Sequence, residues 1–473
     1  METFESNDVF EALSGSFVHK PTQDQLRAFE ALGRFLTEPG PDRVFMLKGY
    51  AGTGKTSLIK SLVSTLPRFK MKAVLMAPTG RAAKVMAQYT GKRASTIHRH
   101  IYSVKSGRGG MAGFSLKANK AVNTIYIVDE ASMIGEHDQS GQNRSLLSDL
   151  IQYVSDGLNC KLILVGDIGQ LPPVGSDRSP ALDPEHLRFN YNLETLAVTM
   201  TEVMRQDRES QILSNATTLR DHQRNSDYSF PALHSGGEVA SLKESFDVED
   251  ALNDSYREAG REGTIIIVRS NKRANLYNQQ IRMRILWQDE RISAGDFLMV
   301  VKNNYFWLPP KSKAGFIANG DTLEILEILE FKQLYGYDFA RVIVRMVDYP
   351  DEPTFEVILN LNVLDLEAAA LSWGQMGKLY ERVEEDYRHI GNRFKRRQKM
   401  RNDPYLNALQ VKFAYAITCH KSQGGQWENV FIEKPWYPNN QLALDDFRWL
   451  YTAFTRAQRK LFLLGFGEEF FPD

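Results

Sequence analysis

The sequence has very few cysteines and no long hydrophobic run. Cys160 and Cys419 are the only two, they lie far apart, and no pair of histidines accompanies them. This pattern argues against both a disulfide framework and a zinc site, and it predicts that each thiol is buried as a small hydrophobe. No stretch reaches the roughly 18 apolar residues of a membrane span, and the first ten residues are acidic without an apolar core. We therefore expect a cytoplasmic protein without a membrane partner.

Net charge is also absent, because 58 Lys and Arg residues balance 58 Asp and Glu residues. The balance gives no argument for a nucleic-acid partner, so any phosphate-binding surface must be local. Hydrophobic residues make up 42% of the chain and charged residues 25%, which is typical of a globular protein with a substantial core. A chain of 473 residues is long enough for three or four structural units.

The first 190 residues alternate short apolar strands with helices. Helices are predicted at residues 21–37 and from Lys55 onward. Strands are predicted at residues 44–47, 72–77, 124–128 and 161–165. This alternation indicates a parallel, doubly wound sheet. Residues 98–123 are rich in Gly, Lys and Ser and fit neither a core helix nor a core strand, so we expect an inserted hairpin or loop there.

A second α/β unit is predicted after residue 190, with a strand at 264–268 and a helix at 274–286. Residues 292–362 then show strand-like periodicity, which predicts a small β-barrel inserted into this unit. Residues 364–401 are helical and end in a basic run, which is either a solvated helix face or a phosphate contact. The α/β pattern resumes at Phe413.

A phosphate-binding loop is indicated at residues 49–56, which read GYAGTGKT and satisfy the pattern GxxxxGK(S/T). The motif follows a strand and opens a helix, which is the context it requires. Its glycines let backbone N–H groups close around phosphate oxygens, Lys55 reaches the β- and γ-phosphates, and the Thr56 hydroxyl ligates Mg²⁺. The predicted ATP-binding residues of the loop are Gly49, Ala51, Gly52, Thr53, Gly54, Lys55 and Thr56.

Two more strands end in polar side chains at the edge where a parallel sheet binds ligands. Asp129 and Glu130 follow the strand at 124–128, where Asp129 is placed to hold Mg²⁺ and Glu130 to orient or deprotonate the attacking water. Gln170 follows the strand at 161–165 and is placed to sense the γ-phosphate. The same segment also suits a simple turn before a proline break, but the order of the three elements favours the catalytic interpretation.

In this order the elements resemble the superfamily 1 helicases, most closely the RecD-like and Dda-like branch, which moves 5′-to-3′. The resemblance covers nearly the whole chain. The further matching segments are residues 22–25 (Q motif), 77–84 (motif Ia), 95–98 (motif Ib), 201–206 (motif IV), 415–424 (motif V) and 450–457 (motif VI).

The resemblance implies roles for residues in these segments. Gln25 would read the adenine, and Arg205 and Arg456 would reach the γ-phosphate from the second lobe, where a planar guanidinium contacts two oxygens at once. Gln423 and Gln426 would contact the nucleotide, although many family members have Glu in place of Gln426 as the ribose contact. The segments that line the single-strand track contain Pro78, Thr79, Arg81, Lys84, Thr96, His98, His420 and Lys421.

The sequence thus predicts two RecA-like lobes with parallel sheets, one at 1–190 and one formed by 191–291 with 406–473. The two insertions would be a duplex-splitting pin at about 98–123 and an SH3-like barrel with a basic helical segment at about 292–405. The predicted activity is 5′-to-3′ DNA unwinding driven by ATP with Mg²⁺, acting on single-stranded DNA and its junctions with duplex. We expect a monomer, with protein partners left open.

Two other functions compete with this interpretation. A nucleotide-dependent switch would have one NTPase lobe and no second set of arginine-bearing motifs, which this chain has. A single-strand translocase that serves as the motor subunit of a recombination or nuclease complex stays open, although no carboxylate cluster typical of a nuclease domain is apparent.

Overall fold

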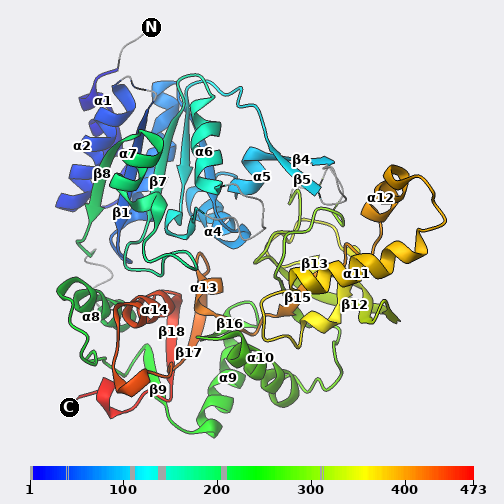
Figure 1. Ribbon diagram of the computed structural model, residues 1–473. Coiled ribbons are helices and arrows are strands. Elements are labelled where there is room, and N and C mark those ends of the chain that lie inside the picture. Colours follow the sequence, from blue (N-terminus) through cyan, green and yellow to red (C-terminus); the bar gives the residue numbers. More distant parts are fainter. Residues whose placement is uncertain are drawn as a thin grey trace.

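The computed structural model describes residues 4–38, 40, 42–106, 112–136, 145–203, 210–308, 312 and 314–472. These residues form two α/β units, a closed barrel and a separate hairpin (Figure 1). The first α/β unit lies above the second in the view of Figure 1, and the barrel lies beside both. This confirms the predicted class of two RecA-like domains with an inserted hairpin and an inserted barrel.

The described residues of the first unit form a parallel sheet in the order β3-β2-β6-β7-β1-β8. Its strands are β1 (Arg43–Gly49), β2 (Lys72–Ala77), β3 (Ala94–Thr96), β6 (Thr124–Val128), β7 (Lys161–Gly166) and β8 (Glu194–Met200). Its helices are α1 (Ser6–Ser16), α2 (Gln23–Thr37), α3 (Lys55–Thr65), α4 (Gly80–Thr90), α5 (Ile97–Ile101), α6 (Leu146–Ser155) and α7 (Pro184–Tyr191).

Both faces of this sheet are buried, as a parallel sheet requires. Along β1, Phe45 and Leu47 pack into one hydrophobic cluster, while Val44 and Met46 pack into the cluster on the opposite face. Strand β8 pairs with β1 in parallel. It lies past residue 190, so the first unit extends further along the chain than the sequence-based division.

The predicted insertion at 98–123 contains a hairpin rather than an irregular loop. Strands β4 (Tyr102–Ser106) and β5 (Ala112–Leu116) pair antiparallel, with Tyr102 opposite Leu116. The turn between them lies outside the described residues. In Figure 1 the hairpin projects from the first unit toward the barrel side.

The second unit is also built on a parallel sheet, in the order β16-β10-β17-β18-β9. Its strands are β9 (Val239–Leu242), β10 (Thr264–Val268), β16 (Ala416–Thr418), β17 (Trp427–Glu433) and β18 (Ala457–Leu464). Its helices are α8 (Gln211–Asn225), α9 (Ser245–Ala259), α10 (Asn271–Gln280), α13 (Cys419–Ser422) and α14 (Leu444–Phe454). The helix predicted at 274–286 is α10 followed by a π-helical turn at Ile281–Ile285.

The barrel closes through a strand that the sequence does not assign to it. Its strands are β11 (Phe297–Val300), β12 (Thr322–Leu334), β13 (Tyr337–Met346), β14 (Phe355–Asn360) and β15 (Leu409–Phe413). Strand β15 pairs with both β11 and β14, although it lies past residue 405, where the predicted insertion ends. Helices α11 (Trp373–Asp386) and α12 (Arg393–Arg401) fill the interval between β14 and β15.

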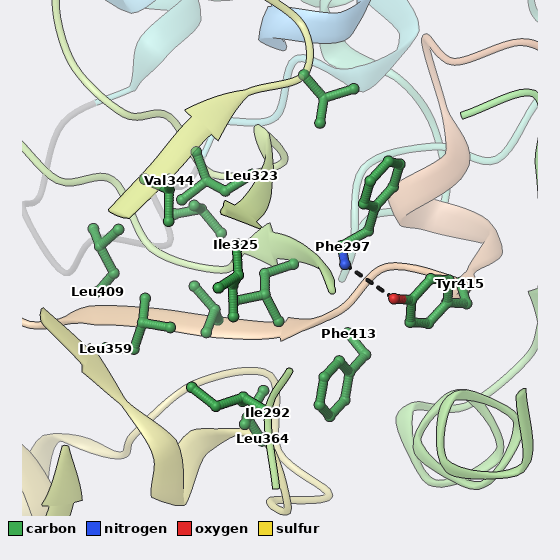
Figure 2. Packing of buried hydrophobic residues seen from close by; sticks show 14 of the residues in the cluster. Ile292, Phe297, Leu323, Ile325, Val344, Leu359, Leu364, Leu409, Phe413 and Tyr415 are labelled. Carbon is green, nitrogen blue, oxygen red and sulfur yellow. Dashed lines mark hydrogen bonds between the residues drawn. The ribbon is translucent and has the colours of Figure 1, made fainter. Parts of the chain in front are cut away.

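Barrel and second unit share one hydrophobic cluster, part of which is drawn in Figure 2. At its edge the Tyr415 hydroxyl accepts a hydrogen bond from the Phe297 backbone N–H at 3.1 Å, the dashed line in Figure 2. The same hydroxyl donates to the Asp296 carboxylate at 3.1 Å, and Arg282 makes a two-pronged ion pair with that carboxylate at 2.9 and 3.0 Å. Since Asp296 and Arg282 are both buried, this network joins the barrel firmly to the second unit.

Both cysteines are buried and free, as predicted. Within the described part of the chain, the helices include none that is long and apolar enough to cross a membrane.

Candidate nucleotide site and nucleic-acid track

The loop after β1 has the backbone geometry of an anion-binding turn. Gly52 and Gly54 have φ angles of +74° and +86°, in the left-handed region that other residues avoid. Helix α3 begins directly after Gly54, and no side chain caps its N-terminus. Its first N–H groups are therefore left to an external acceptor, and a phosphate fits there on grounds of charge and hydrogen bonding.

The Lys55 side chain lies within this loop. Its ammonium group donates to the carbonyls of Gly49 and Tyr50, both at 2.8 Å. These are neutral acceptors, which an anionic phosphate can replace at little cost. Thr56 is exposed at the start of α3, beside Lys55.

Gln25 supports the phosphate-binding loop through a hydrogen bond to its backbone. Its side-chain oxygen accepts the Thr22 N–H at 2.9 Å, and its side-chain nitrogen donates to the Thr53 carbonyl at 3.2 Å. Only 1% of Gln25 is exposed. Both ends of the amide are thus engaged within the protein, and the predicted adenine contact stays a prediction.

Asp129 and Glu130 lie at the end of β6, next to the loop. The two Asp129 oxygens accept hydrogen bonds from the Glu130 N–H at 2.9 Å and the Tyr89 hydroxyl at 2.7 Å. Tyr89 comes from α4, and sequence patterns do not identify it because a tyrosine in a helix most often packs in the core. The hydrogen bond fixes the direction of the Asp129 carboxylate, as the second shell of a metal site does.

Glu130 has an unusual environment. Its φ angle is +53°, in the left-handed region that non-glycine residues seldom adopt. Burial raises the pKa of Glu130 to about 7, against the opposing effect of Arg456. The Arg456 guanidinium, from the second unit, lies 3.9 Å from the Glu130 carboxylate. A carboxylate with such a pKa is suited to accept and return a proton near neutral pH.

Arg456 is held rigidly for this position. It is only 4% exposed, and it donates to the carbonyls of Thr452 and Gly425 at 3.0 and 3.2 Å and to the Thr455 hydroxyl at 3.1 Å. The other predicted arginine, Arg205, lies outside the described residues. The chain leading to it is anchored where the Thr201 N–H donates to Asp24 at 2.6 Å.

The loop after β7 is hydrogen-bonded to the second unit. The Leu171 N–H donates to the Thr452 hydroxyl at 2.9 Å, and the Leu171 carbonyl accepts from the Gln423 side chain at 2.7 Å. Gln170 is 7% exposed, and its side-chain oxygen finds no hydrogen-bond partner among the described residues. A buried unpaired carbonyl is costly, which is consistent with a site that a ligand completes. Gln423 acts here as a strut between the units.

A second hydrogen bond between the units joins Tyr451 to Asp167, and the sequence analysis assigns a role to neither residue. The buried Tyr451 hydroxyl donates to Asp167 at 2.8 Å and accepts from the Ala51 N–H at 2.7 Å. Burial raises the pKa of Tyr451 well above its ordinary value, so its hydroxyl stays protonated. The phosphate loop, the loop after β7 and α14 thus meet at one atom.

Gln426 lies on the second unit at the edge of the interface. Its side chain accepts from Gln458 at 2.9 Å, and its backbone carbonyl accepts from Arg81 at 3.2 Å. The Arg81 guanidinium also stacks over the Trp427 ring at 3.9 Å. Arg81 is predicted to contact single-stranded nucleic acid, and in the structure it connects α4 with the second unit.

The predicted track residues of the first unit come together at the carboxyl ends of two strands. Strands β2 and β3 pair with Ala77 opposite Thr96, so the turns that follow them are neighbours. Thr79 and Thr96 each cap the next helix through their hydroxyls, at 3.2 Å. Pro78 lies between β2 and α4, and His98 lies 5.6 Å from Tyr102 between ring centres.

Three other predicted track residues do not form a freely exposed surface, because each is paired within the protein or partly buried. The Lys84 ammonium lies 3.7 Å from Asp348 and donates to the Val347 carbonyl at 3.3 Å, so it contacts the barrel. His420 and Lys421 lie in α13, where burial lowers both pKa values, that of Lys421 to about 8. In each residue burial, and not a neighbouring positive charge, is the main cause of the lowered pKa.

Comparison with known proteins agrees with this geometry. A family model described as an AAA domain matches residues 22–243, and one described as the UvrD-like helicase C-terminal domain matches residues 413–464. The ATP-dependent DNA helicase dda of Enterobacteria phage T4 is 23% identical over 465 residues, covering 93% of this chain and 98% of the phage protein. The chain is similar to the phage helicase over nearly its whole length.

Two other relatives are similar over different extents. The ATP-dependent RecD2 DNA helicase of Deinococcus radiodurans is 34% identical over 132 residues, 28% of this chain and 16% of that protein. The uncharacterized protein MJ1519 of Methanocaldococcus jannaschii is 24% identical over 463 residues, 89% of this chain and 36% of that protein. The chain thus spans about a third or less of these two relatives' length. The two family models cover parts of both α/β units, and the first ends at residue 243, directly after β9 of the second unit.

Proposed function

We propose that this protein is an ATP-dependent DNA helicase that translocates 5′-to-3′ along single-stranded DNA. The observation that carries the proposal is the position of Arg456, whose guanidinium reaches from the second unit to within 3.9 Å of Glu130 beside the phosphate loop of the first. An ATPase in which each unit supplies part of the site links hydrolysis to relative movement of the units. The names of the Dda and RecD2 relatives support the same activity.

In this proposal ATP binds in the loop after β1. Lys55 leaves its two carbonyl acceptors for the phosphates, and the N–H groups of α3 receive phosphate oxygens. Thr56 and Asp129 would hold Mg²⁺, which supplies neutralising charge to the phosphates when bound. Glu130 orients the attacking water and accepts its proton, while Arg456 meets the charge that develops on the transferred group.

The struts between the units couple this chemistry to movement. Gln423 and Thr452 both hold Leu171, the neighbour of Gln170, so a change at Gln170 on phosphate release reaches the second unit directly. His420 and Lys421, which we propose bind single-stranded DNA, lie just before Gln423 in the chain. They therefore move together with the Gln423–Leu171 hydrogen bond. We assign the hairpin β4–β5 as the pin that separates the strands.

The test is strand displacement from duplexes carrying one single-stranded tail, with ATP and Mg²⁺. We expect displacement from the 5′-tailed duplex only, together with ATPase activity that single-stranded DNA raises at least about tenfold, because a strand bound across both units favours their closed arrangement. Displacement from the 3′ tail alone would overturn the polarity. DNA-stimulated ATPase without displacement from either tail would instead support a translocase that works inside a larger complex, and an ATPase that ignores nucleic acid would support the switch.

A further inference from the structure

Helix α12 carries an unusual concentration of positive charge. Six of its nine residues are cationic and none is acidic, namely Arg393, Lys395, Arg396, Arg397, Lys399 and Arg401. Among the described residues, Arg396 alone of these six has a carboxylate within 4.0 Å, that of Glu384 at 3.1 Å. In a chain with no net charge, this is a local positive surface on which five of the six cations have no carboxylate within that distance among the described residues.

The arrangement of these charges disfavours the helix itself. Arg393 with Arg397, and Lys395 with Lys399, are like charges four residues apart, which destabilise a helix. Arg393 and Lys395 also lie in the first turn, where the helix dipole already presents positive charge. A bound anion would relieve both effects.

The rest of the protein nevertheless holds α12 in place. Met400 is 1% exposed and packs in a cluster with Phe339, Leu379 and Val383 of the barrel and α11. Asn392 caps the helix, accepting from the backbone N–H groups of residues 394 and 395 at 3.0 and 3.1 Å. The exposed side chains of Arg393, Lys395 and Lys399 are thus carried on an anchored helix, so the backbone needs little further ordering when they bind a polyanion.

We propose that the exposed cations of α12 bind the phosphates of duplex DNA before the strands are separated. The assignment rests on the proposed helicase function and names where the duplex would be held. In Figure 1, α12 stands at the outer end of the barrel region, on the same flank from which the β4–β5 hairpin projects and away from the sheet of the second unit. Duplex DNA carries one charge per roughly 1.7 Å of its axis, so it matches a surface this dense in cations better than a single strand does.

The experiment compares two triple variants of the full chain with equal loss of charge. Arg393→Gln, Lys395→Gln and Lys399→Gln remove the exposed cations of α12. Lys60→Gln, Arg68→Gln and Lys72→Gln form the control, because these side chains are exposed on the first unit and none has a salt bridge within the described residues. Binding is measured by fluorescence anisotropy with a blunt duplex and, separately, with a single strand of the same length.

We expect the α12 variant to bind the duplex at least about tenfold more weakly, and the control to stay within about twofold of the unaltered protein. The slope of log affinity against log salt should fall by about two to three, roughly one for each phosphate that the variant no longer neutralises. ATPase activity stimulated by single-stranded DNA should not change. These results together would support the assignment.

Four results would overturn it. Unchanged duplex affinity in the α12 variant, or an equal loss in the control, would remove any specific role of the helix. An equal loss of single-strand binding would place α12 on the track instead. Since Phe394 is 76% exposed on the same helix, a Phe394→Ala variant that lost as much duplex binding as the charge variant would point to an apolar contact. Failure of the helicase proposal is distinguishable, because it appears as an ATPase that DNA does not stimulate in the unaltered protein.

Discussion

The Tyr451 hydroxyl donates a hydrogen bond across the interface between the two α/β units to the Asp167 carboxylate, at 2.8 Å. The same oxygen receives the N–H of Ala51 in the phosphate loop at 2.7 Å. A single buried atom of the second unit therefore contacts both the loop that would hold ATP and the loop that would sense its hydrolysis.

Removing this hydroxyl should weaken ATP binding. Tyr451→Phe keeps the ring beside Tyr50 but leaves the Asp167 oxygen and the Ala51 N–H without their partner, at a cost of about 1–3 kcal/mol in the closed arrangement. We expect ATP affinity to fall roughly tenfold, measured by titration with a fluorescent ATP analogue. Tyr437→Phe is the control, because that buried hydroxyl has no partner among the described residues. Unaltered affinity in Tyr451→Phe would show that the strut does not support the nucleotide site.

Lys55→Ala should abolish ATP turnover and leave the fold intact. The Lys55 ammonium contacts two carbonyls of its own loop and no part of the core, so its loss should not change thermal unfolding without nucleotide by more than a few degrees. Turnover is measured with saturating single-stranded DNA. Lys60→Ala, an exposed cation on the same helix, should keep full activity. Near-normal turnover in Lys55→Ala would mean that this loop is not the phosphate site.

Glu130→Gln should separate binding from hydrolysis. The amide is similar in shape but cannot take a proton, so we expect ATP to bind with hydrolysis reduced at least about a hundredfold. Single-turnover kinetics and equilibrium binding report the two quantities separately. Glu185→Gln, at an exposed position in α7, is the matched control. Loss of ATP binding in a folded Glu130→Gln protein would contradict the proposed division of roles between Glu130 and Asp129.

Tyr89→Phe should raise the Mg²⁺ concentration needed for half-maximal ATPase activity. The lost hydroxyl orients the Asp129 carboxylate at 2.7 Å, and changes of this kind typically weaken metal affinity by about 10- to 100-fold. The measurement is an Mg²⁺ titration, with EDTA abolishing turnover in all variants. Tyr191→Phe removes a hydroxyl from a different carboxylate, that of Glu136 at 3.4 Å, and should leave the titration unchanged. A Tyr89→Phe titration identical to that of the unaltered protein would remove Asp129 from the metal site.

Local chemistry explains what could be predicted from sequence. The loop at Gly49 to Thr56 and the strand before Asp129 are defined by neighbouring residues, so their elements agree with the structure to within a few positions. Sequence patterns place strands β8 and β15 in the wrong units because their pairing is non-local. Most residues of strand β8 are exposed or half-buried instead of forming a buried apolar run, and β15 returns to the barrel only after two helices.

The same distinction applies to the site. Motifs name Gln25, Lys84 and Gln423, but only the packing of distant segments shows that Gln25 holds Thr53, that Lys84 faces Asp348 and that Gln423 holds Leu171. Tyr89 and Tyr451 escape prediction for a related reason. Each hydroxyl acquires its role from a carboxylate 40 or more positions away in the chain.

Strand β15 has a mechanical consequence. It closes the barrel, and its last residue, Phe413, is only three positions from the first residue of β16, the edge strand that leads into α13 with His420 and Lys421. Tyr415, between the two strands, is fastened to Phe297 and Asp296. The barrel is therefore not an independent module. A displacement of the barrel would be transmitted through β15 to the segment that we propose binds DNA, and deletion of residues 292–405 would remove the strands with which β15 pairs.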